Sequence, residues 1–407
     1  MKSCRFCQKS LDLEFVDLVN APPSNAFLKL EALVGPETYY PLKLFVCGSC
    51  FLVQLDEYKA AQEIFDDDYA YFSSYSQSWL KHCKKYAENV IERFQLTSKS
   101  KVVEIASNDG YLLQYFKERG VKALGIEPTQ STADVAIGKG IETIIRFFGK
   151  ACARDLVHER GKADLIAANN VLAHVPDLND FVGGFKLLLA EDGVVTVEFP
   201  HVVQLIKLKQ FDTIYHEHFS YFSLHTICQI FEKHGLRVFD VEELVTHGGS
   251  LRIYVDHGSQ HPLSPSVQAL LGRERQEGVN TLKFYEGFQA VTDDVKNGFL
   301  EFLLQAKKSG KSVAAYGAAA KGNTFLNYCG IKRDLIKFAV DASPHKQGRF
   351  MPGSHIPILN EAALREAKPD YVVILPWNLK KEITEQLSYI RKWDGKFAIA
   401  IPKMDIF

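Results

Sequence analysis

Residues 215–221, which read YHEHFSY, bring together more acid–base groups than a hydrophobic period would explain. Two histidines, one glutamate and two tyrosines stand between two apolar segments. A buried strand would not hold Glu217 between His216 and His218 without compensation, because an unpaired charge in a core is costly. This group of titratable side chains favours an active site over the alternative, a polar loop with a hydrogen-bonded histidine.

Four cysteines form two C-x-x-C pairs, Cys4 with Cys7 and Cys47 with Cys50. Each pair places two thiolates on one tight turn, and two pairs complete the tetrahedron that structural Zn²⁺ prefers. Because four thiolates leave no open coordination position, we expect a structural rather than a catalytic zinc site. Chance pairs or a redox couple are the alternatives.

The composition of the 407 residues narrows the class of protein, and the length predicts two or three domains. A net charge of −1 argues against nucleic-acid binding, which usually needs a basic excess. The sequence has no uninterrupted apolar run long enough to cross a membrane, and the N-terminal MKSCRFCQKS lacks the apolar core of a secretory signal. Eight cysteines without such a signal indicate a reducing compartment. We therefore expect a cytoplasmic protein, either a monomer or a weak oligomer.

A β-branched strand, a small polar turn and an amphipathic helix follow one another in SKVVEIASNDGYLLQYF, residues 100–116. A second strand, ALGIEP, ends at Glu127, an acid in the position that binds ribose hydroxyls in dinucleotide folds. The turn lacks the G-x-G-x-x-G fingerprint and places Asp109 where a pyrophosphate would come close. A cofactor with a ribose but no phosphates fits better, and S-adenosylmethionine is the common one.

The α/β pattern continues with a buried strand, ADLIAANNV, which brings Asn169, Asn170 and His174 to the ligand-binding edge of a sheet. For His174, a core or capping role is the alternative. After the strand DGVVTVEFPH, Ser223 caps a helix that Gly235 closes, and RVFDVEEL and SLRIYVDH form an antiparallel ending. This order predicts a class I methyltransferase sheet. The residues expected to bind the cofactor are Glu104, Ala106, Asn108, Asp109, Gly110, Glu127, Asn169 and Asn170.

The segment FDDDYAYFSSYSQSW, residues 65–79, is dense in tyrosine and serine. One interpretation is the start of a helix, with Ser76 or Ser78 as its N-cap. The other is a polar aromatic wall that faces a ligand. The sequence leaves both interpretations open.

A second nucleotide-fold pattern begins with SVAAYGAAAKGNTFLNY, residues 312–328, which reads as strand, small-residue turn and helix. Gly317 and the alanines after it let a ligand approach the backbone, and Lys321 at the start of the helix makes an anion site. A tight structural turn is the alternative. The missing glycine fingerprint gives a nicotinamide cofactor only weak support.

The next strand of this C-terminal unit ends at Asp341 and leads into the loop SPHKQGRFMPG. His345, Lys346 and Arg349 in that loop are either diphosphate contacts or solvated charges.

The motifs EIASNDG, NNVLAHV and YHEHFSY, with the four cysteines, resemble the nucleotide-sugar C-methyltransferases of deoxysugar pathways. The resemblance covers nearly the whole chain. It implies an α/β fold in which a class I, Rossmann-like methyltransferase domain lies between an N-terminal zinc-binding domain and a second Rossmann-like domain. We expect these domains at residues 1–68, 69–262 and 263–407, with the third binding the nucleotide sugar. The residues implied there, around the signature turn GAAAKGN, are Gly317, Ala318, Lys321, Gly322, Asn323, Asp341, Lys346 and Arg349.

A carbon can accept a methyl group from a sulfonium only after it becomes nucleophilic, which beside a ketone means forming an enolate. The resemblance makes His218 the base, Tyr215 the donor to the enolate oxygen and Glu217 an orienting group. His174 and Tyr69 would line the same cavity. The implied substrate is a nucleotide-linked 4-keto-6-deoxysugar, which we expect to be dTDP-linked and methylated at C3.

Tyr215 and His218 can reach one ligand only if YHEH forms a turn, where residues i and i+3 meet, rather than a strand. We expect this turn between the cofactor sheet and the C-terminal domain, with His216 in a structural role. Three other functions remain open: a small-molecule O- or N-methyltransferase, an NAD-dependent oxidoreductase using the C-terminal fold, and a zinc-dependent nucleic-acid module. The last of these would need a basic face.

Overall fold

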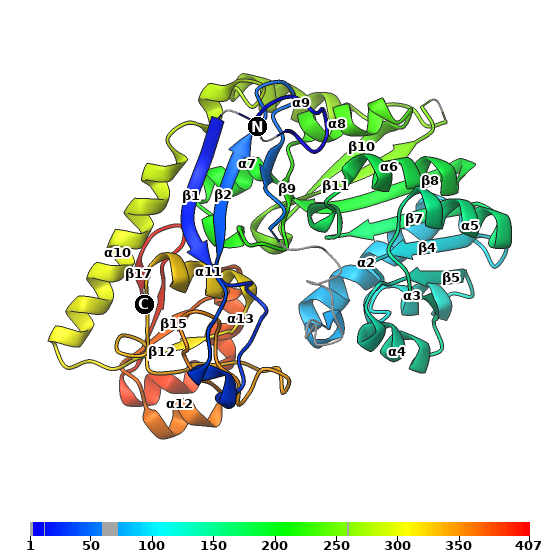
Figure 1. Cartoon of the computed structure of the whole chain (residues 1–407). Helices are drawn as coiled ribbons and strands as arrows, with labels where there is room; N and C mark the ends of the chain where they lie inside the picture. Colours follow the sequence, from blue (N-terminus) through cyan, green and yellow to red (C-terminus); the bar gives the residue numbers. More distant parts are fainter. Residues whose placement is uncertain (1–2, 12, 59–71, 259) are drawn as a thin grey trace.

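Three β-sheets organise the part of the chain that this computed structural model describes, residues 3–11, 13–58, 72–258 and 260–407 (Figure 1). The N-terminal sheet has the order β1-β2-β3-β9 and is antiparallel. Its fourth strand comes from far along the chain, directly after the YHEH stretch. The strands are β1 Leu13–Ala21, β2 Tyr40–Val46, β3 Val53–Leu55 and β9 Ser220–Tyr221, with the 3₁₀ helix η1 at Leu30–Val34.

The central sheet has seven strands in the order β10-β11-β8-β7-β4-β5-β6. Strand β11 runs antiparallel to both of its neighbours, and the other pairs from β8 to β6 are parallel. This is the class I methyltransferase sheet that the strand pattern predicts. The strands are β4 Lys101–Ile105, β5 Lys122–Ile126, β6 Glu142–Ile144, β7 Ala163–Asn169, β8 Leu189–Pro200, β10 Arg237–Leu244 and β11 Ser250–Asp256.

Serine caps begin two helices of this unit: Ser76, one of the two cap candidates in residues 65–79, and Ser223, as the sequence predicts. The Ser76 hydroxyl accepts from the Trp79 N–H and begins α2, and Ser223 accepts from the Thr226 N–H and begins α8. The α-helices are α2 Gln77–Arg93, α3 Leu113–Glu118, α4 Gln130–Gly138, α5 Lys150–Arg160, α6 Leu178–Leu188, α7 Val202–Lys207, α8 Leu224–Lys233 and α9 Pro265–Gln276. The 3₁₀ helices are η2 Ser73–Tyr75, η3 Leu172–His174, η4 Phe211–Thr213 and η5 Thr246–Gly248.

The C-terminal unit is a second Rossmann-like sheet, parallel except for its last strand, with the order β14-β13-β12-β15-β16-β17. Its strands are β12 Val313–Tyr316, β13 Ala339–Val340, β14 Ile358–Leu359, β15 Tyr371–Ile374, β16 Lys396–Ile399 and β17 Asp405–Ile406. Its helices are η6 Leu282–Tyr285, α10 Phe288–Lys308, α11 Ala320–Tyr328, α12 Ala362–Ala367, η7 Trp377–Leu379, α13 Lys380–Gln386 and η8 Ser388–Trp393.

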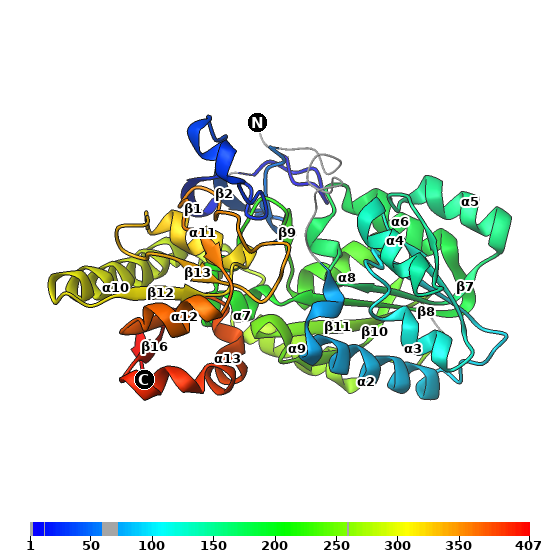
Figure 2. The same cartoon turned by 90° about the horizontal axis from the view of Figure 1, so that it is seen from below.

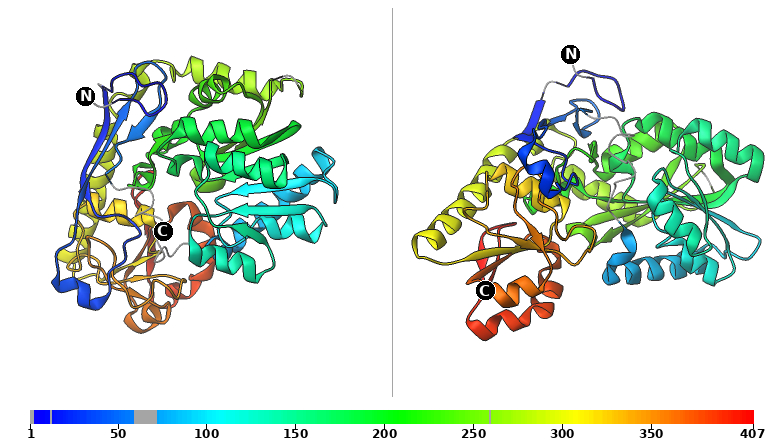
Figure 3. Two further views of the ribbon diagram at one scale, coloured as in Figure 1. Left: turned by 45° about the vertical axis from the view of Figure 1, so that its right-hand side comes forward. Right: turned by 60° about the horizontal axis from the view of Figure 1, so that its bottom comes forward.

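The N-terminal sheet ties the two α/β units together. Leu44 of β2 and Val53 of β3 share one hydrophobic core with Phe299 of α10 and Phe325 of α11. The cysteine end of the same segment packs on the methyltransferase core instead. The two α/β units lie side by side with the N-terminal segment (blue) over their junction (Figures 2 and 3).

Helix α9 lies beyond the boundary expected at residue 262, yet Val267 and Leu270 pack in the methyltransferase core. The domain boundaries therefore stay predictions. In the described residues, no helix combines the length and apolar composition needed to cross a membrane.

Candidate active site

The four cysteines meet at the end of the N-terminal sheet. Cys4 Sγ lies 3.6 Å from Cys50 Sγ, and Cys7 Sγ lies 3.4 Å from Cys47 Sγ. All four sulfur atoms lie within 4.8 Å of one another. Tetrahedral Zn²⁺ with Zn–S bonds of about 2.3 Å holds its sulfurs about 3.8 Å apart, so the four thiols fit this ion.

A cavity of about 360 Å³ opens at the carboxyl ends of β4, β5 and β7, which is the edge where open α/β sheets bind ligands. Several of the predicted cofactor residues line it: Ala106, Asn108, Glu127, Asn169 and Asn170. His174 lines the same cavity.

The turns that face this cavity are strained. Ala106, Asn108 and Asn170 adopt φ angles of 56°, 48° and 54°, in the left-handed region that side chains usually avoid. The Glu127 carboxylate holds the first turn, because its oxygens accept from the N–H groups of Asn108 at 2.8 Å and Thr129 at 2.9 Å. Strain of this kind often marks a ligand site.

The polar groups of the cavity fit S-adenosylmethionine. The side-chain oxygens of Asn169 and Asn170 are buried without a hydrogen-bond partner in the described part of the chain. A ligand with hydroxyl or ammonium donors would satisfy them. Burial raises the pKa of Glu127 and holds the pKa of Glu104, beneath the turn, well above the ordinary value.

Three predicted cofactor residues do not line the cavity: Glu104, Asp109 and Gly110. The Asp109 carboxylate accepts from the Ser74 N–H at 3.2 Å and lies 3.5 Å from Lys139 Nζ. Gly110 has a φ of 76°, and a Cβ there would lie 2.4 Å from Ile141 Cδ1. Asp109 is thus already paired, and Gly110 is needed for close packing.

The YHEH stretch is a turn, as the sequence predicts. The His218 N–H donates to the Tyr215 carbonyl at 2.9 Å, so residues i and i+3 close together. The two rings lie with centroids 4.0 Å apart, and the Tyr215 hydroxyl is 2.9 Å from His218 Nε2. His218 Nδ1 lies 2.9 Å from the Thr213 carbonyl, which can only accept. The proton of neutral His218 therefore sits on Nδ1, and Nε2 accepts from Tyr215.

His174 joins this pair from the cofactor side. Its ring centroid lies 4.6 Å from that of His218 in an edge-to-face contact. Burial lowers the pKa of His174 to about 4 and holds the pKa of His218 well below its ordinary value, with the charge of His174 contributing to the latter. Both imidazoles are therefore neutral near pH 7, which is the state that can accept a proton.

The other two members of the stretch point to the N-terminal sheet. His216 Nε2 lies 3.2 Å from the Pro41 carbonyl, in agreement with the structural role expected for it. The Glu217 carboxylate accepts from Asn25 Nδ2 at 2.6 Å and is buried. Tyr69 lies outside the described residues.

Residues from all three units hold the YHEH stretch. Thr324 of α11 donates to the Ile214 carbonyl at 2.8 Å, and Trp377 Nε1 donates to the Asp212 carboxylate at 2.8 Å. Directly after the stretch, β9 pairs with β3 of the zinc-binding segment. Burial raises the pKa of Asp212 to about 6, against the opposing effect of the nearby Lys321 charge. The turn thus lies at the junction of the three units, in the position the sequence predicts.

The residues expected to bind the nucleotide sugar are largely engaged within the protein. The Ala318 N–H donates to Asp341 Oδ2 at 2.7 Å, and Lys346 Nζ donates to the Ala318 carbonyl at 3.0 Å. A Cβ at Gly317 would lie 2.5 Å from the Pro376 ring.

Further along the same turn, Gly322 packs against Leu375, where a Cβ would lie 2.9 Å from a methyl carbon. Asn323 Nδ2 donates to the Ser24 carbonyl of the N-terminal unit. Lys321 Nζ donates to Asn378 Oδ1 at 2.9 Å, and its charge helps lower the pKa of His218.

The loop candidates lie further out. Arg349 is half-buried, while His345 lies 3.3 Å from the Tyr75 hydroxyl and stacks on Phe72 at 5.4 Å.

Sequence reasoning missed several residues that line the cavity. Phe147 and Phe148 follow β6, whose carboxyl end lies at the same edge, and this position was an available signal. Trp79 and His247 reach the cavity from α2 and from the loop between β10 and β11. The interpretation of residues 65–79 as an aromatic wall includes Trp79, whereas no local pattern indicates the contact of His247.

The sheet order and the cleft define a class I, S-adenosylmethionine-dependent methyltransferase. Family models match consecutive parts of the chain: a zinc-binding domain at residues 4–65, a methyltransferase domain at 77–241 and a C-methyltransferase C-terminal domain at 245–402. The C-methyltransferase NovU of Streptomyces niveus is 35% identical over 401 residues, which cover 98% of this chain and 95% of NovU. The chain therefore belongs to the C-methyltransferase family.

Solved structures are similar over less than half of the chain. An S-adenosylmethionine-dependent methyltransferase from Clostridium acetobutylicum is 13% identical, with a TM-score of 0.36, and covers 44% of this chain and 92% of its own. The PH0226 protein from Pyrococcus horikoshii is 14% identical, with a TM-score of 0.37, and covers 46% of this chain and 94% of its own.

Proposed function

We propose that this C-methyltransferase methylates the carbon beside the ketone, C3, of a nucleotide-linked 4-keto-6-deoxysugar, with dTDP as the nucleotide. The observation that carries the proposal is the Tyr215–His218 pair, joined at 2.9 Å, next to the cofactor cavity. The resemblance of its motifs to nucleotide-sugar C-methyltransferases and the similarity to NovU support this choice of substrate. Transfer to oxygen or nitrogen would not need a carbon base.

In this proposal His218 removes the proton from the carbon next to the ketone. The hydrogen bond from Nδ1–H to the Thr213 carbonyl keeps the Nε2 lone pair directed away from the backbone. A buried imidazole with a low pKa is a weak base in the free enzyme. The enolate that forms beside it is negative, so it raises the proton affinity of His218 at the moment when the proton moves.

Tyr215 is the proposed donor to the ketone oxygen. In the free protein its hydroxyl donates to His218 Nε2, so both groups are satisfied. Rotating the hydroxyl toward a bound ketone would release the His218 lone pair and place a donor where the enolate charge develops. One motion would therefore prepare both partners.

The cofactor supplies an electrophilic methyl group when it is bound. We infer that Glu127 binds its ribose hydroxyls, that Asn169 and Asn170 accept from its polar groups, and that Phe147 and Phe148 pack on its ring. Glu104, buried beneath the turn, supports this wall from behind.

His174, between the cavity and His218, would contact the sugar, and Glu217 would position the turn through Asn25. We propose that Lys321 and Arg349 bind the diphosphate of the sugar nucleotide. Lys346 would have to leave the Ala318 carbonyl to take part. The zinc site would hold β3 in place as the partner strand of β9.

The test is incubation with S-adenosylmethionine and a panel of dTDP-, UDP- and GDP-linked 4-keto-6-deoxysugars in deuterated water. Mass spectrometry should find one added methyl group in a dTDP-linked sugar, and NMR should place it at C3. Without cofactor, deuterium should enter at C3 by way of His218. Absence of both methyl gain and deuterium exchange with every sugar would reject the proposed substrate class.

A further inference from the structure

One histidine of the cavity has no part in the chemistry above. His247 stands in η5, the short loop between β10 and β11, and its side chain lines the cofactor cavity. Its Nδ1 atom is buried and has no hydrogen-bond partner in the described part of the chain. A buried nitrogen left unpaired costs stability, so a ligand is the natural partner to consider.

The backbone of this histidine is strained. His247 adopts φ 54° and ψ 18°, and the following Gly248 and Gly249 have φ angles of 90° and 116°. A left-handed conformation at a residue other than glycine is unfavourable and persists only where its surroundings enforce it. Such positions cluster at ligand sites.

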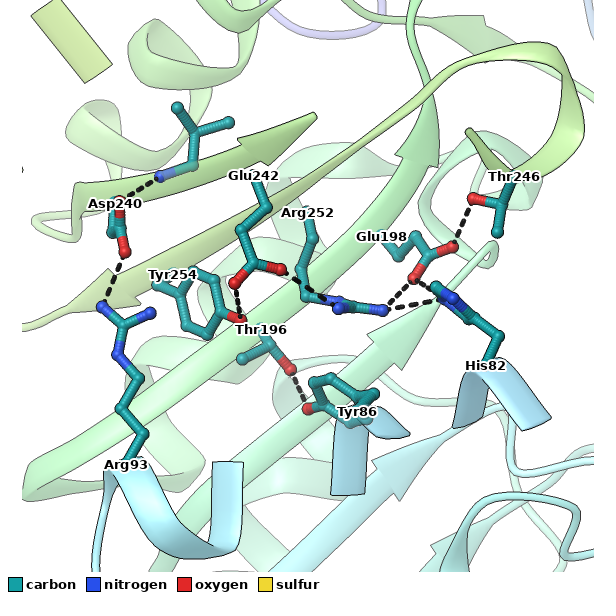
Figure 4. A network of polar contacts seen from close by, with 11 residues as sticks. His82, Tyr86, Arg93, Thr196, Glu198, Asp240, Glu242, Thr246, Arg252 and Tyr254 are labelled. Carbon is teal, nitrogen blue, oxygen red and sulfur yellow. Dashed lines mark hydrogen bonds and ion pairs between the residues drawn. The ribbon is translucent and has the colours of Figure 1, made fainter. Parts of the chain in front are cut away.

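A buried ionic network enforces the loop from one side (Figure 4). The Thr246 hydroxyl donates to Glu198 Oε1 at 2.9 Å, and the other oxygen of Glu198 accepts from Arg252 and lies 2.9 Å from His82 Nε2. Glu198 is fully buried, and burial alone would raise its pKa. His82 and Arg252 outweigh that effect and lower the pKa to about 2. The loop is thus anchored to a fixed charge in the sheet.

Gln210 and the C-terminal unit hold the loop from the other side. Gln210, five residues before Tyr215, donates from Nε2 to the Gly248 carbonyl at 2.7 Å. A Cβ at Gly248 would lie 2.6 Å from the Trp377 ring of the C-terminal unit. The Trp79 ring packs edge-to-face against the His247 ring, with centroids 5.3 Å apart.

The order of the strands decides which ligand His247 can meet. Phe147, Phe148 and Glu127 reach the cavity from β6 and β5 at one edge of the sheet, whereas β10 and β11 form the opposite edge. His247 therefore stands at the end of the cavity away from the residues assigned to ribose and ring. When protonated, His247 would lower the pKa of His218, and the charge of Lys321 lowers the pKa of both imidazoles.

We propose that His247 binds the methyl acceptor, giving a hydrogen bond to a hydroxyl or carbonyl oxygen of the sugar and so fixing the ring relative to His218. This inference rests on the proposed function. A neutral imidazole suits a sugar oxygen, because it offers a hydrogen bond without a net charge. His247 stays neutral near pH 7 because burial lowers its pKa to about 4.

The test uses His247→Asn, because asparagine tolerates a left-handed backbone better than most residues. His158→Asn, on the exposed face of α5, is the matched control. Calorimetry with S-adenosylhomocysteine, without acceptor, should give affinities within threefold of wild type for both variants. With dTDP-4-keto-6-deoxyglucose, His247→Asn should raise KM at least tenfold, while the control should not change it. His247→Gln serves as the second variant if the first does not fold.

A tenfold loss of S-adenosylhomocysteine affinity in both His247 variants would assign the residue to the cofactor and overturn the proposal. An unchanged KM for the sugar would make the histidine structural and would overturn it as well. Failure of the wild-type protein to methylate any sugar would reject the proposed function separately, while the calorimetry would still show whether His247 belongs to the cofactor half of the cavity.

Discussion

The two Rossmann-like turns of this chain share one hydrogen-bond pattern. In the methyltransferase unit, the acid after the second strand, Glu127, accepts from the Asn108 N–H of the first turn at 2.8 Å. In the C-terminal unit, Asp341 after β13 accepts from the Ala318 N–H of its turn at 2.7 Å. Each acid also accepts from the N–H two residues onward, at 2.9 and 2.8 Å.

The two turns differ in what lies above them. A cavity of about 360 Å³ stands over the first, whereas Pro376, Leu375 and Lys346 cover the second. Helix α11, which follows the second turn, contacts the N-terminal unit through Asn323 and the catalytic stretch through Thr324. The same backbone arrangement therefore borders an open cavity in one unit and supports the YHEH stretch in the other, and the side chains opposite the turn make the difference.

The largest expected effect is a loss of methyl transfer without a loss of cofactor binding. His218→Asn should lower methyl transfer about a thousandfold, because a positioned general base contributes about 10²–10⁴. S-adenosylhomocysteine affinity, measured by calorimetry, should stay within twofold. Turnover close to wild type would remove His218 from the mechanism, and His158→Asn controls for loss of a surface histidine.

Tyr215→Phe should slow methyl transfer about a hundredfold, the scale for one oxyanion donor. Because the variant also frees His218 Nε2 from its 2.9 Å partner, deuterium exchange into the sugar should fall less than methyl transfer. Stopped assays with NMR detection measure both rates. Equal losses in the two rates would indicate that Tyr215 acts before proton removal.

Asp212→Asn should stabilise the protein at neutral pH. The folded-state pKa of Asp212 is raised from 3.8 to about 6, so the folded state holds a proton that the unfolded state releases. Stability therefore falls as pH rises from about 4 to 6, by up to about 3 kcal/mol, and stays lower above that. Urea unfolding at pH 4.5 and 7.5 should show a flatter dependence in Asp212→Asn. Exposed Asp334→Asn is the control, and a parallel pH dependence in Asp212→Asn and wild type would contradict the assignment.

Glu127→Gln and Asp341→Asn test the two equivalent acids directly. Loss of the charge at Glu127 should weaken S-adenosylhomocysteine binding about tenfold or more, because hydrogen bonds to a charged group are worth about 1.5–3 kcal/mol. Asp341→Asn should leave that affinity unchanged and lower the free energy of unfolding instead. Calorimetry measures the affinity and urea titration the free energy of unfolding of both variants. Equal changes of both quantities in the two variants would refute the different roles of the two acids.

The smallest effect concerns the support given by the second unit. Thr324→Val removes the hydrogen bond to the Ile214 carbonyl and should cost about 1 kcal/mol of stability, together with a severalfold loss of kcat. Thr384→Val removes a similar bond within α13, to the Lys380 carbonyl, far from the catalytic stretch. Equal kcat in both variants would show that α11 does not position the turn.

Local patterns predicted much of this molecule. Strand β4, strand β5 (which ends one residue before the expected Glu127), the cap at Ser223 and the cysteine cluster each depend on neighbours in the sequence. The YHEH turn was predictable because the chemistry required residues i and i+3 to meet.

Contacts between distant segments were not predictable in the same way. Strand β9 is only Ser220–Tyr221, too short to show an alternating pattern, and it exists because β3 offers a free edge. The filling of the second turn by Pro376 and the approach of His247 to the cavity depend on residues about 60 or more positions from their partners. The predicted cofactor and sugar contacts remain predictions.

The pairing of β9 with β3 bears on how such enzymes can be recombined. By sequence the YHEH turn belongs to the methyltransferase part of the chain, but its side chains form hydrogen bonds with Asn25 and the Pro41 carbonyl of the N-terminal unit. A chimera that imports a foreign methyltransferase stretch would bring in an edge strand and a turn fitted to another parent. Productive crossovers should therefore keep residues 4–58 and 211–221 from one parent, even though more than 150 residues separate them.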